Sequence, residues 1–201
     1  RAQSKVGDSS IYFDGSDSLS VADSPDWDFG SNAWTMEFWF RLTSATAGIF
    51  SMGPSSGDIA VSVYRSHSSL DVYISSDGSN WDIQTGTVGM SPSDDTWYHF
   101  ALVFTGSAYL NFVDGVLEKT TTSSTAIYDG NHSMLMGLDS SGNYSTGYMD
   151  EVRVSDTARY TANFTTFGQD GGTISNPTPF TADANTKLLI HSDWDGGLGA
   201  D

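Results

Sequence analysis

Hydrophobic and polar positions alternate with a period of two along much of the chain, most regularly in residues 96–118. A first alternating run, residues 98–104, is followed by a Thr-Gly-Ser turn and by a second run at 110–113. The second run ends at Asp114-Gly115, a dipeptide that readily adopts the positive backbone angles of a tight hairpin turn. The next residues are therefore expected to fold back as a third strand. This meander predicts an antiparallel all-β domain.

Further strand candidates occur throughout the chain, and clusters of Gly, Ser, Asn and Asp separate nearly all of them. Outside the meander, strands are expected at residues 10–13, 18–21, 35–42, 48–52, 59–64, 70–75, 81–85, 133–137, 147–155 and 186–191. The pattern predicts no amphipathic helix, and at most one helical turn within 156–163. Because so many strands occur without crossover helices, two packed antiparallel sheets are the expected architecture, a β-sandwich.

The alternation also assigns sheet faces within two of these strands. In residues 34–41 the expected core set is Trp34, Met36, Phe38 and Phe40. In residues 148–155, a period of two places Glu151 and Arg153 on one face and Asp150 on the other. If the two strands are neighbours, the charged side chains can form a ladder of Glu37, Arg41, Glu151 and Arg153. We interpret this ladder as a solvated face with cross-strand ion pairs rather than as a ligand site.

Composition narrows the range of partners. The chain has 201 residues, which suits one large domain, and it carries 25 acidic against 8 basic residues, a net charge of −17. Phosphate backbones and anionic lipid surfaces would be repelled, so neither nucleic acid binding nor membrane insertion is expected. Three of the acidic residues are Glu, which leaves 22 Asp, a turn former and hard oxygen ligand. Cations are therefore more suitable partners for the loops than anions are.

Two further features concern the setting of the chain. It contains no cysteine, so neither a disulfide nor a thiolate metal site is possible. It opens at Arg1 with neither a start methionine nor a signal peptide, and we expect it to have been processed or excised from a longer protein.

Four segments in this order resemble a known family: SSIYFDG at 9–15, WTMEFWFRL at 34–42, DTWYHFALVFTGSAYLNFVDGVL at 95–117, and GYMDEVRVSDTARY at 147–160. Together they look like the concanavalin A-like jelly roll, and more narrowly its laminin-G-type branch of bacterial, marine and phage surface proteins. The resemblance covers residues 8–168 of a single domain, 1–201. It implies a two-sheet sandwich whose relatives mostly bind glycans or surfaces, or serve as structural modules.

The C-terminal extension, residues 169–201, contains a displaced element. Residues 180–197 resemble the opening strand of such a domain in tandem arrays. Either the strand at 186–191 closes its own sandwich, as in a circular permutation, or it enters a neighbouring copy. We hypothesise that the chain is one period of a repeat, or a subunit linked to copies of itself by donated strands.

A glycoside hydrolase of the same fold is the main enzymatic alternative. Such enzymes need a paired acid and nucleophile about 5 to 10 Å apart, flanking one bond. The three Glu are far apart in sequence, and period two sends Asp150 and Glu151 to opposite faces. We therefore expect no catalytic residues and no enzymatic activity.

Calcium is the cofactor that the sequence favours. Its sites need six to eight oxygen ligands, which Asp-rich turns provide. Two turns are candidates by spacing, 26–32 and 193–196. The family resemblance instead implies one structural ion held by Asp14, Asp17 and Asp150. The alternative is that these Asp residues simply stabilise turns.

Sugar binding calls for aromatic side chains that stack on pyranose faces beside polar groups. Trp81 follows an Asp- and Ser-rich loop and is the favoured contact, with Tyr64, Tyr73 and Tyr144 near other turns. The alternative is that these rings belong to the core or its rim. The sequence thus predicts a non-catalytic adhesion or recognition module on a cell surface or virion exterior. Its expected partners are a glycan or cell-surface polysaccharide and further copies of itself; a purely structural repeat is the alternative.

Overall fold

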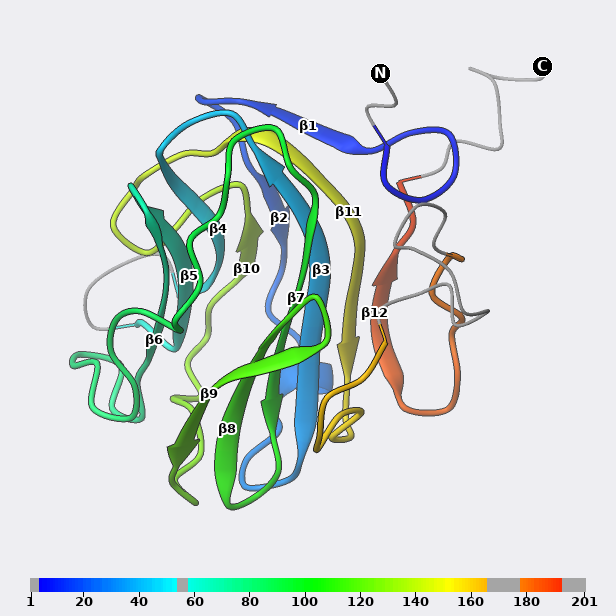
Figure 1. Ribbon diagram of the computed structural model, residues 1–201. Helices are drawn as coiled ribbons and strands as arrows, with labels where there is room; N and C mark the ends of the chain where they lie inside the picture. Colours follow the sequence, from blue (N-terminus) through cyan, green and yellow to red (C-terminus); the bar gives the residue numbers. More distant parts are fainter. Residues whose placement is uncertain (1–3, 54–57, 166–177, 193–201) are drawn as a thin grey trace.

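The computed structural model describes residues 4–53, 58–165 and 178–192. These residues form two antiparallel sheets packed face to face, with one short 3-10 turn at Pro25–Trp27 (Figure 1). The predicted all-β sandwich is confirmed. None of the described residues belongs to a helix long and apolar enough to cross a membrane.

The larger sheet has seven strands in the order β1-β11-β3-β7-β8-β9, with β12 also paired to β11. Its strands are β1 (Ile11–Asp14), β3 (Trp34–Leu42), β7 (Tyr98–Phe104), β8 (Ala108–Val113), β9 (Val116–Thr122), β11 (Thr146–Ser155) and β12 (Thr186–Ile190). The predicted meander is β7-β8-β9. Asp114 and Gly115 connect its last two strands with φ angles of 48° and 78°, as the dipeptide predicted.

Strands β1 and β12 share one edge of β11. Residues 146–149 of β11 pair with β1, and residues 152–155 pair with β12, while β3 occupies the opposite edge. The C-terminal strand therefore lies end to end with β1 in the same sheet (Figure 1). In this structure β12 is paired within its own chain, which is the arrangement of the first of the two alternatives.

The smaller sheet has five strands in the order β2-β10-β4-β5-β6. They are β2 (Leu19–Val21), β10 (Met134–Met136), β4 (Thr46–Met52), β5 (Val61–Ser66) and β6 (Ser69–Ile74).

One local prediction was wrong. The expected strand at 81–85 is a loop that pairs with β6 only through an isolated bridge between Gln84 and Ile74. No helical turn forms within 156–163, in agreement with the expectation of one turn at most. The only 3-10 turn among the described residues is Pro25–Trp27, where the Ser24 side chain accepts from the Asp26 amide.

The core lies between the two sheets. The four side chains of β3 that were expected there are each at most 2% exposed: Trp34, Met36, Phe38 and Phe40. Phe38 joins the layers, since its ring lies 5.7 Å from Phe50 of β4 and 5.5 Å from Phe100 of β7. Aromatic pairs at these distances add to the free energy gained by burial.

A β-bulge in β11 alters the predicted faces. The pairing with β3 shifts by one residue between Asp150 and Arg153, and Glu151 has a φ angle of 50°. Met149 and Val152 both belong to the core as a result. The prediction that Asp150 and Glu151 lie on opposite faces is therefore wrong, because the extra residue places both on the outer side of the sheet.

Candidate functional site

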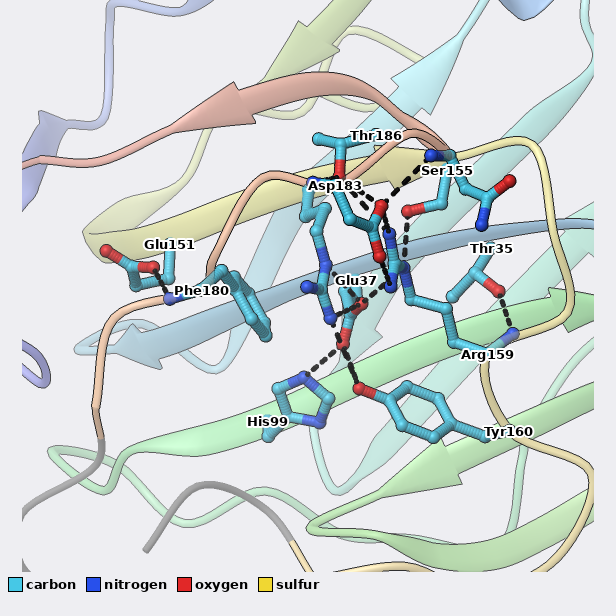
Figure 2. Close-up of polar contacts among 12 residues, drawn as sticks. Thr35, Glu37, His99, Glu151, Ser155, Arg159, Tyr160, Phe180, Asp183 and Thr186 are labelled. Carbon is cyan, nitrogen blue, oxygen red and sulfur yellow. Dashed lines mark hydrogen bonds and ion pairs between the residues drawn. The ribbon is translucent and has the colours of Figure 1, made fainter.

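The outer face of the seven-stranded sheet carries a buried charge cluster centred on Glu37. Glu37 is fully buried, and its Oε1 accepts from Arg153 Nε at 2.8 Å and Nη2 at 2.6 Å. Its Oε2 accepts from the Tyr160 hydroxyl at 2.8 Å and lies 3.2 Å from His99 Nε2 (Figure 2). The predicted pair between Glu37 and Arg153 is confirmed, but the expectation of a solvated face is wrong.

This cluster anchors the C-terminal segment across the sheet. Arg159 pairs with Asp183 at 2.8 Å, and the guanidinium of Arg153 lies over the Phe180 ring at 4.0 Å. Glu151 accepts from the Phe180 amide at 2.6 Å (Figure 2). Glu151 also pairs with His191 at 2.6 Å.

The fourth ladder residue, Arg41, and the neighbouring Asp150 have other partners. Arg41 pairs with Asp95 at 2.8 Å, and Asp150 accepts from the amides of Lys5 and Val6. The predicted ladder is thus divided among separate partners. The adjacent carboxylates of Asp150 and Glu151 are each engaged by other chain segments rather than facing one another across a cleft.

Burial would by itself raise the pKa of Glu37, since it disfavours the charged form. The hydrogen bond and charge of His99, together with those of Arg153, outweigh burial and hold the pKa of Glu37 below its ordinary value. Glu37 is therefore a carboxylate at neutral pH, and its role in this arrangement is to fix the covering segments.

A pocket of about 340 Å³ opens on the outer face of the five-stranded sheet. Its floor comes from β5 and β6, whose alternate side chains face the core. Its walls are the loop after β6 and the loop after β10. The lining residues are Ser62, Tyr64, Tyr73, Trp81, Asp139, Ser140, Ser141 and Asn143.

The first wall is Trp81, whose ring lies 5.6 Å from that of Tyr73 at an angle of 48°. Asp77 shapes the loop that carries it, because one carboxylate oxygen accepts from the amides of Ser79 and Asn80 at 2.8 and 2.7 Å. Hydrogen bonds from Asn80 and Ser79 lower the pKa of Asp77 to about 2. Asp82 closes the loop by accepting from the Ser76 amide at 2.8 Å, so Trp81 has a supported position.

The second wall is the loop at residues 139–143, which Asp139 holds in shape. Asp139 is 3% exposed, and its carboxylate accepts from the amides of Ser141 and Asn143 and from the Asn143 side chain, each at 2.8 Å. The loop passes directly over Gly48 of β4. A Cβ at that position would lie 2.2 Å from both the Asp139 nitrogen and the Asn143 carbonyl oxygen, so only glycine allows the approach.

A further acid, Asp71, lies on the strand that carries Tyr73. Asp71 of β6 is 8% exposed and stands directly opposite Tyr64 of β5. Burial and the charge of Asp71 raise the pKa of the Tyr73 hydroxyl. The pocket therefore combines aromatic faces, hydroxyl groups and buried carboxylates.

The structure brings together three of the four aromatic residues that the sequence singled out, Trp81, Tyr64 and Tyr73. Tyr144 does not line the pocket; it follows Asn143 and is 41% exposed. Sequence reasoning missed Asp139 and Asn143, although the run DSSGN is a typical signal for a turn closed by an Asp side chain. Their binding roles stay predictions.

The predicted metal residues are not gathered at one point. Asp14 and Asp17 share a turn, where the Asp14 amide donates to Asp17 and the Asp14 carboxylate accepts from Ser16. Asp14 pairs with Thr146 of β11, and Asp150 lies four residues farther along, about 13 Å at the usual strand rise. These three carboxylates do not fit a single ion.

The described residues contain no group of three metal-ligating side chains. Of the two turns suggested by spacing, 193–196 lies outside the described residues, and 26–32 contains the 3-10 turn. Calcium stays a prediction.

The two-sheet topology and the outward-facing pocket define a jelly-roll domain of the lectin type. Residues 13–163, which are 151 of the 201, match the family model of the concanavalin A-like lectin/glucanases superfamily in its laminin G form. The chain belongs to this family, as its four motifs indicated. The comparison with curated proteins gives no match.

Solved structures with the same fold include proteins connected with carbohydrate. A proposed carbohydrate-binding protein from Bacteroides ovatus has a TM-score of 0.65 at 17% identity, covering 89% of this chain and 50% of its own. The fourth domain of an extracellular arabinanase from Geobacillus stearothermophilus, solved with arabinotriose, has a TM-score of 0.54 at 16% identity, with coverages of 73% and 70%. Two domains of the mouse laminin α1 chain have a TM-score of 0.55 at 16% identity, with coverages of 76% and 44%.

Proposed function

We propose that this chain is a non-catalytic carbohydrate-binding module and that its binding site is the pocket between Trp81 and the loop at 139–143. The observation that carries the proposal is the pair of tilted rings, Trp81 and Tyr73, facing a polar loop across a cavity of about 340 Å³. Sugar rings present an apolar face to aromatic side chains and hydroxyls to polar groups. The aromatic wall can therefore stack on a sugar ring while the polar loop bonds to its hydroxyls.

The structural comparisons support a carbohydrate ligand. The arabinanase domain was solved with arabinotriose, and the Bacteroides ovatus protein is proposed to bind carbohydrate. The sequence identities to these two structures are 16% and 17%, so the comparisons establish a shared fold only. The class of ligand is part of our proposal.

The absence of catalysis is also part of the proposal. A glycosidase needs a free acid and a second carboxylate on either side of the scissile bond. The carboxylate in the pocket lining, Asp139, already accepts three hydrogen bonds from its own loop and supports the wall. Incubating the protein with any polysaccharide that it binds should release no reducing ends.

The remaining expectations extend this proposal. We infer an extracellular setting, on a cell surface or virion exterior, from the family and from the net charge of −17, which disfavours anionic partners inside cells.

We also keep a repetitive assembly as a proposal, with copies joined side by side, since β12 is already paired within the chain. Sedimentation of the full chain over a range of concentrations tests it, and a strictly monomeric chain would argue against self-association.

A glycan array tests the binding proposal. The array is probed with the native chain, with Trp81→Ala and with Tyr12→Ala. Tyr12 is a suitable control because it is an aromatic residue 53% exposed on β1, in the other sheet. We expect the native chain and Tyr12→Ala to mark the same glycans and Trp81→Ala to lose them. Retention of the signal by Trp81→Ala would exclude this pocket.

A further inference from the structure

Resting on the proposed function, we propose that the pocket selects uncharged, hydroxyl-rich sugar units and rejects units that carry a carboxylate or a sulfate. The selection arises from the buried acids Asp71 and Asp139 at the pocket and from a lining that contains no Lys or Arg.

The first step concerns Asp71. It stands directly opposite Tyr64 of β5, and it shares a face of β6 with Tyr73, two residues away. Both tyrosines line the pocket. Asp71 is 8% exposed, so its charge lies next to the pocket at a place where water screens it weakly.

The second step concerns charge. Asp139 lines the pocket and, like Asp71, is buried, so two carboxylates act on a ligand where water screens them weakly. None of the residues that line the pocket is a Lys or Arg. The neighbouring cation on β5, Arg65, donates instead to the Ser44 carbonyl at 3.0 Å and to Asp94 at 2.6 Å. An anionic ligand therefore meets repulsion without a compensating partner.

The third step concerns size. The volume of about 340 Å³ lies at the small end of the usual range for ligand pockets, about 300 to 1,000 Å³. The pocket thus suits a short part of a glycan, and further units of the glycan would extend outward past Trp81.

Matched pairs of small sugars test the selectivity. The probes are methyl glycosides of glucose, galactose, arabinose and xylose, each hexoside compared with its uronic acid, and affinities are measured by ligand-observed NMR. We expect at least one neutral glycoside to bind. We expect the corresponding uronate to bind with an affinity at least about tenfold lower. Equal or tighter binding of the uronate would overturn the proposed selectivity while leaving carbohydrate binding intact. Failure of every probe and of the glycan array would overturn the proposed function itself.

Two variants test whether the charge of Asp71 causes the selectivity. Asp71→Asn removes the charge and keeps the shape of the side chain, and it should narrow the gap in affinity between glycoside and uronate several-fold. Glu118→Gln makes the same change in net charge on exposed β9 and should leave the gap unchanged. An unchanged gap in Asp71→Asn would overturn the role of Asp71.

Salt dependence of the native chain supplies a test that needs no variant. Raising the salt concentration should strengthen uronate binding by screening the repulsion and should leave neutral binding unaltered. Uronate binding that weakens with salt would indicate an attractive cation and contradict the proposal.

Discussion

Replacing Glu37 by Gln should destabilise the domain more than any single change at its exposed ion pairs. Glu37→Gln keeps the shape of the side chain but removes the negative charge opposite Arg153, which is 7% exposed. Removing one partner of a buried pair leaves the other charge uncompensated, at a cost of about 3 to 5 kcal/mol. The Tyr160 hydroxyl, which donates to the same carboxylate, also loses a charged acceptor.

The loss is measured by urea unfolding at pH 7 and by thermal melting. For a chain of this size, 3 to 5 kcal/mol corresponds to a fall in Tm of about 6 to 20 °C. Asp95→Asn is the control, because its partner Arg41 forms a pair in which the Asp side chain is 52% exposed. Such a pair contributes less than about 1 kcal/mol. A Glu37→Gln variant no less stable than Asp95→Asn would refute the reasoning.

The contribution of Glu37 to the free energy of unfolding should depend on pH. The folded pKa of Glu37 is lowered, so its stabilising effect is present above the unfolded value of about 4.3 and is lost as the pH falls through the folded pKa. The difference in unfolding free energy between the native chain and Glu37→Gln should therefore shrink below about pH 4. A difference that stays constant down to pH 2 would contradict a lowered pKa.

Three further predictions concern the pocket and the proposed ion. Gly48→Ala should lower stability by about 1 to 3 kcal/mol and weaken sugar binding, because its Cβ displaces the loop at 139–143; unaltered melting and affinity would contradict the close approach. Asp77→Ala should weaken sugar binding with little change in Tm, since it releases the loop carrying Trp81; full affinity on titration would show that the loop needs no such support. Calcium should raise the melting midpoint and a chelator should lower it if the predicted structural ion is bound, and an unchanged midpoint would dismiss that ion.

The strands and the core could be predicted from the sequence because their signals are local. The alternation in 98–104 and the turn at Asp114-Gly115 each act within a few residues, and so does the apolar face of β3. The bulge at Glu151 could not be predicted in this way. Two adjacent charged residues, Asp150 and Glu151, interrupt the alternation there, but only the pairing with β3 shows that one residue is extra.

The site could be predicted only in part, for a related reason. Trp81, Tyr64 and Tyr73 follow from the preference of sugars for aromatic rings near turns. Asp139 and Asn143 join them only because β10 pairs with β4 and β4 with β5, which folds the loop after β10 over Gly48. The burial of Glu37 likewise depends on where residues 156–165 and 178–191 lie, and no local pattern specifies that position.

Nuclear magnetic resonance of the isotopically labelled chain tests the central claim most directly. A neutral glycan identified on the array is titrated in, and the side-chain N–H signals of the six Trp and of the Asn residues are followed. The account predicts saturable shifts for the Trp81 indole and the Asn143 amide, with the Trp97 indole on the other sheet unmoved. Shifts at Trp97 without shifts at Trp81 would contradict the account, because the sugar would then bind outside this pocket.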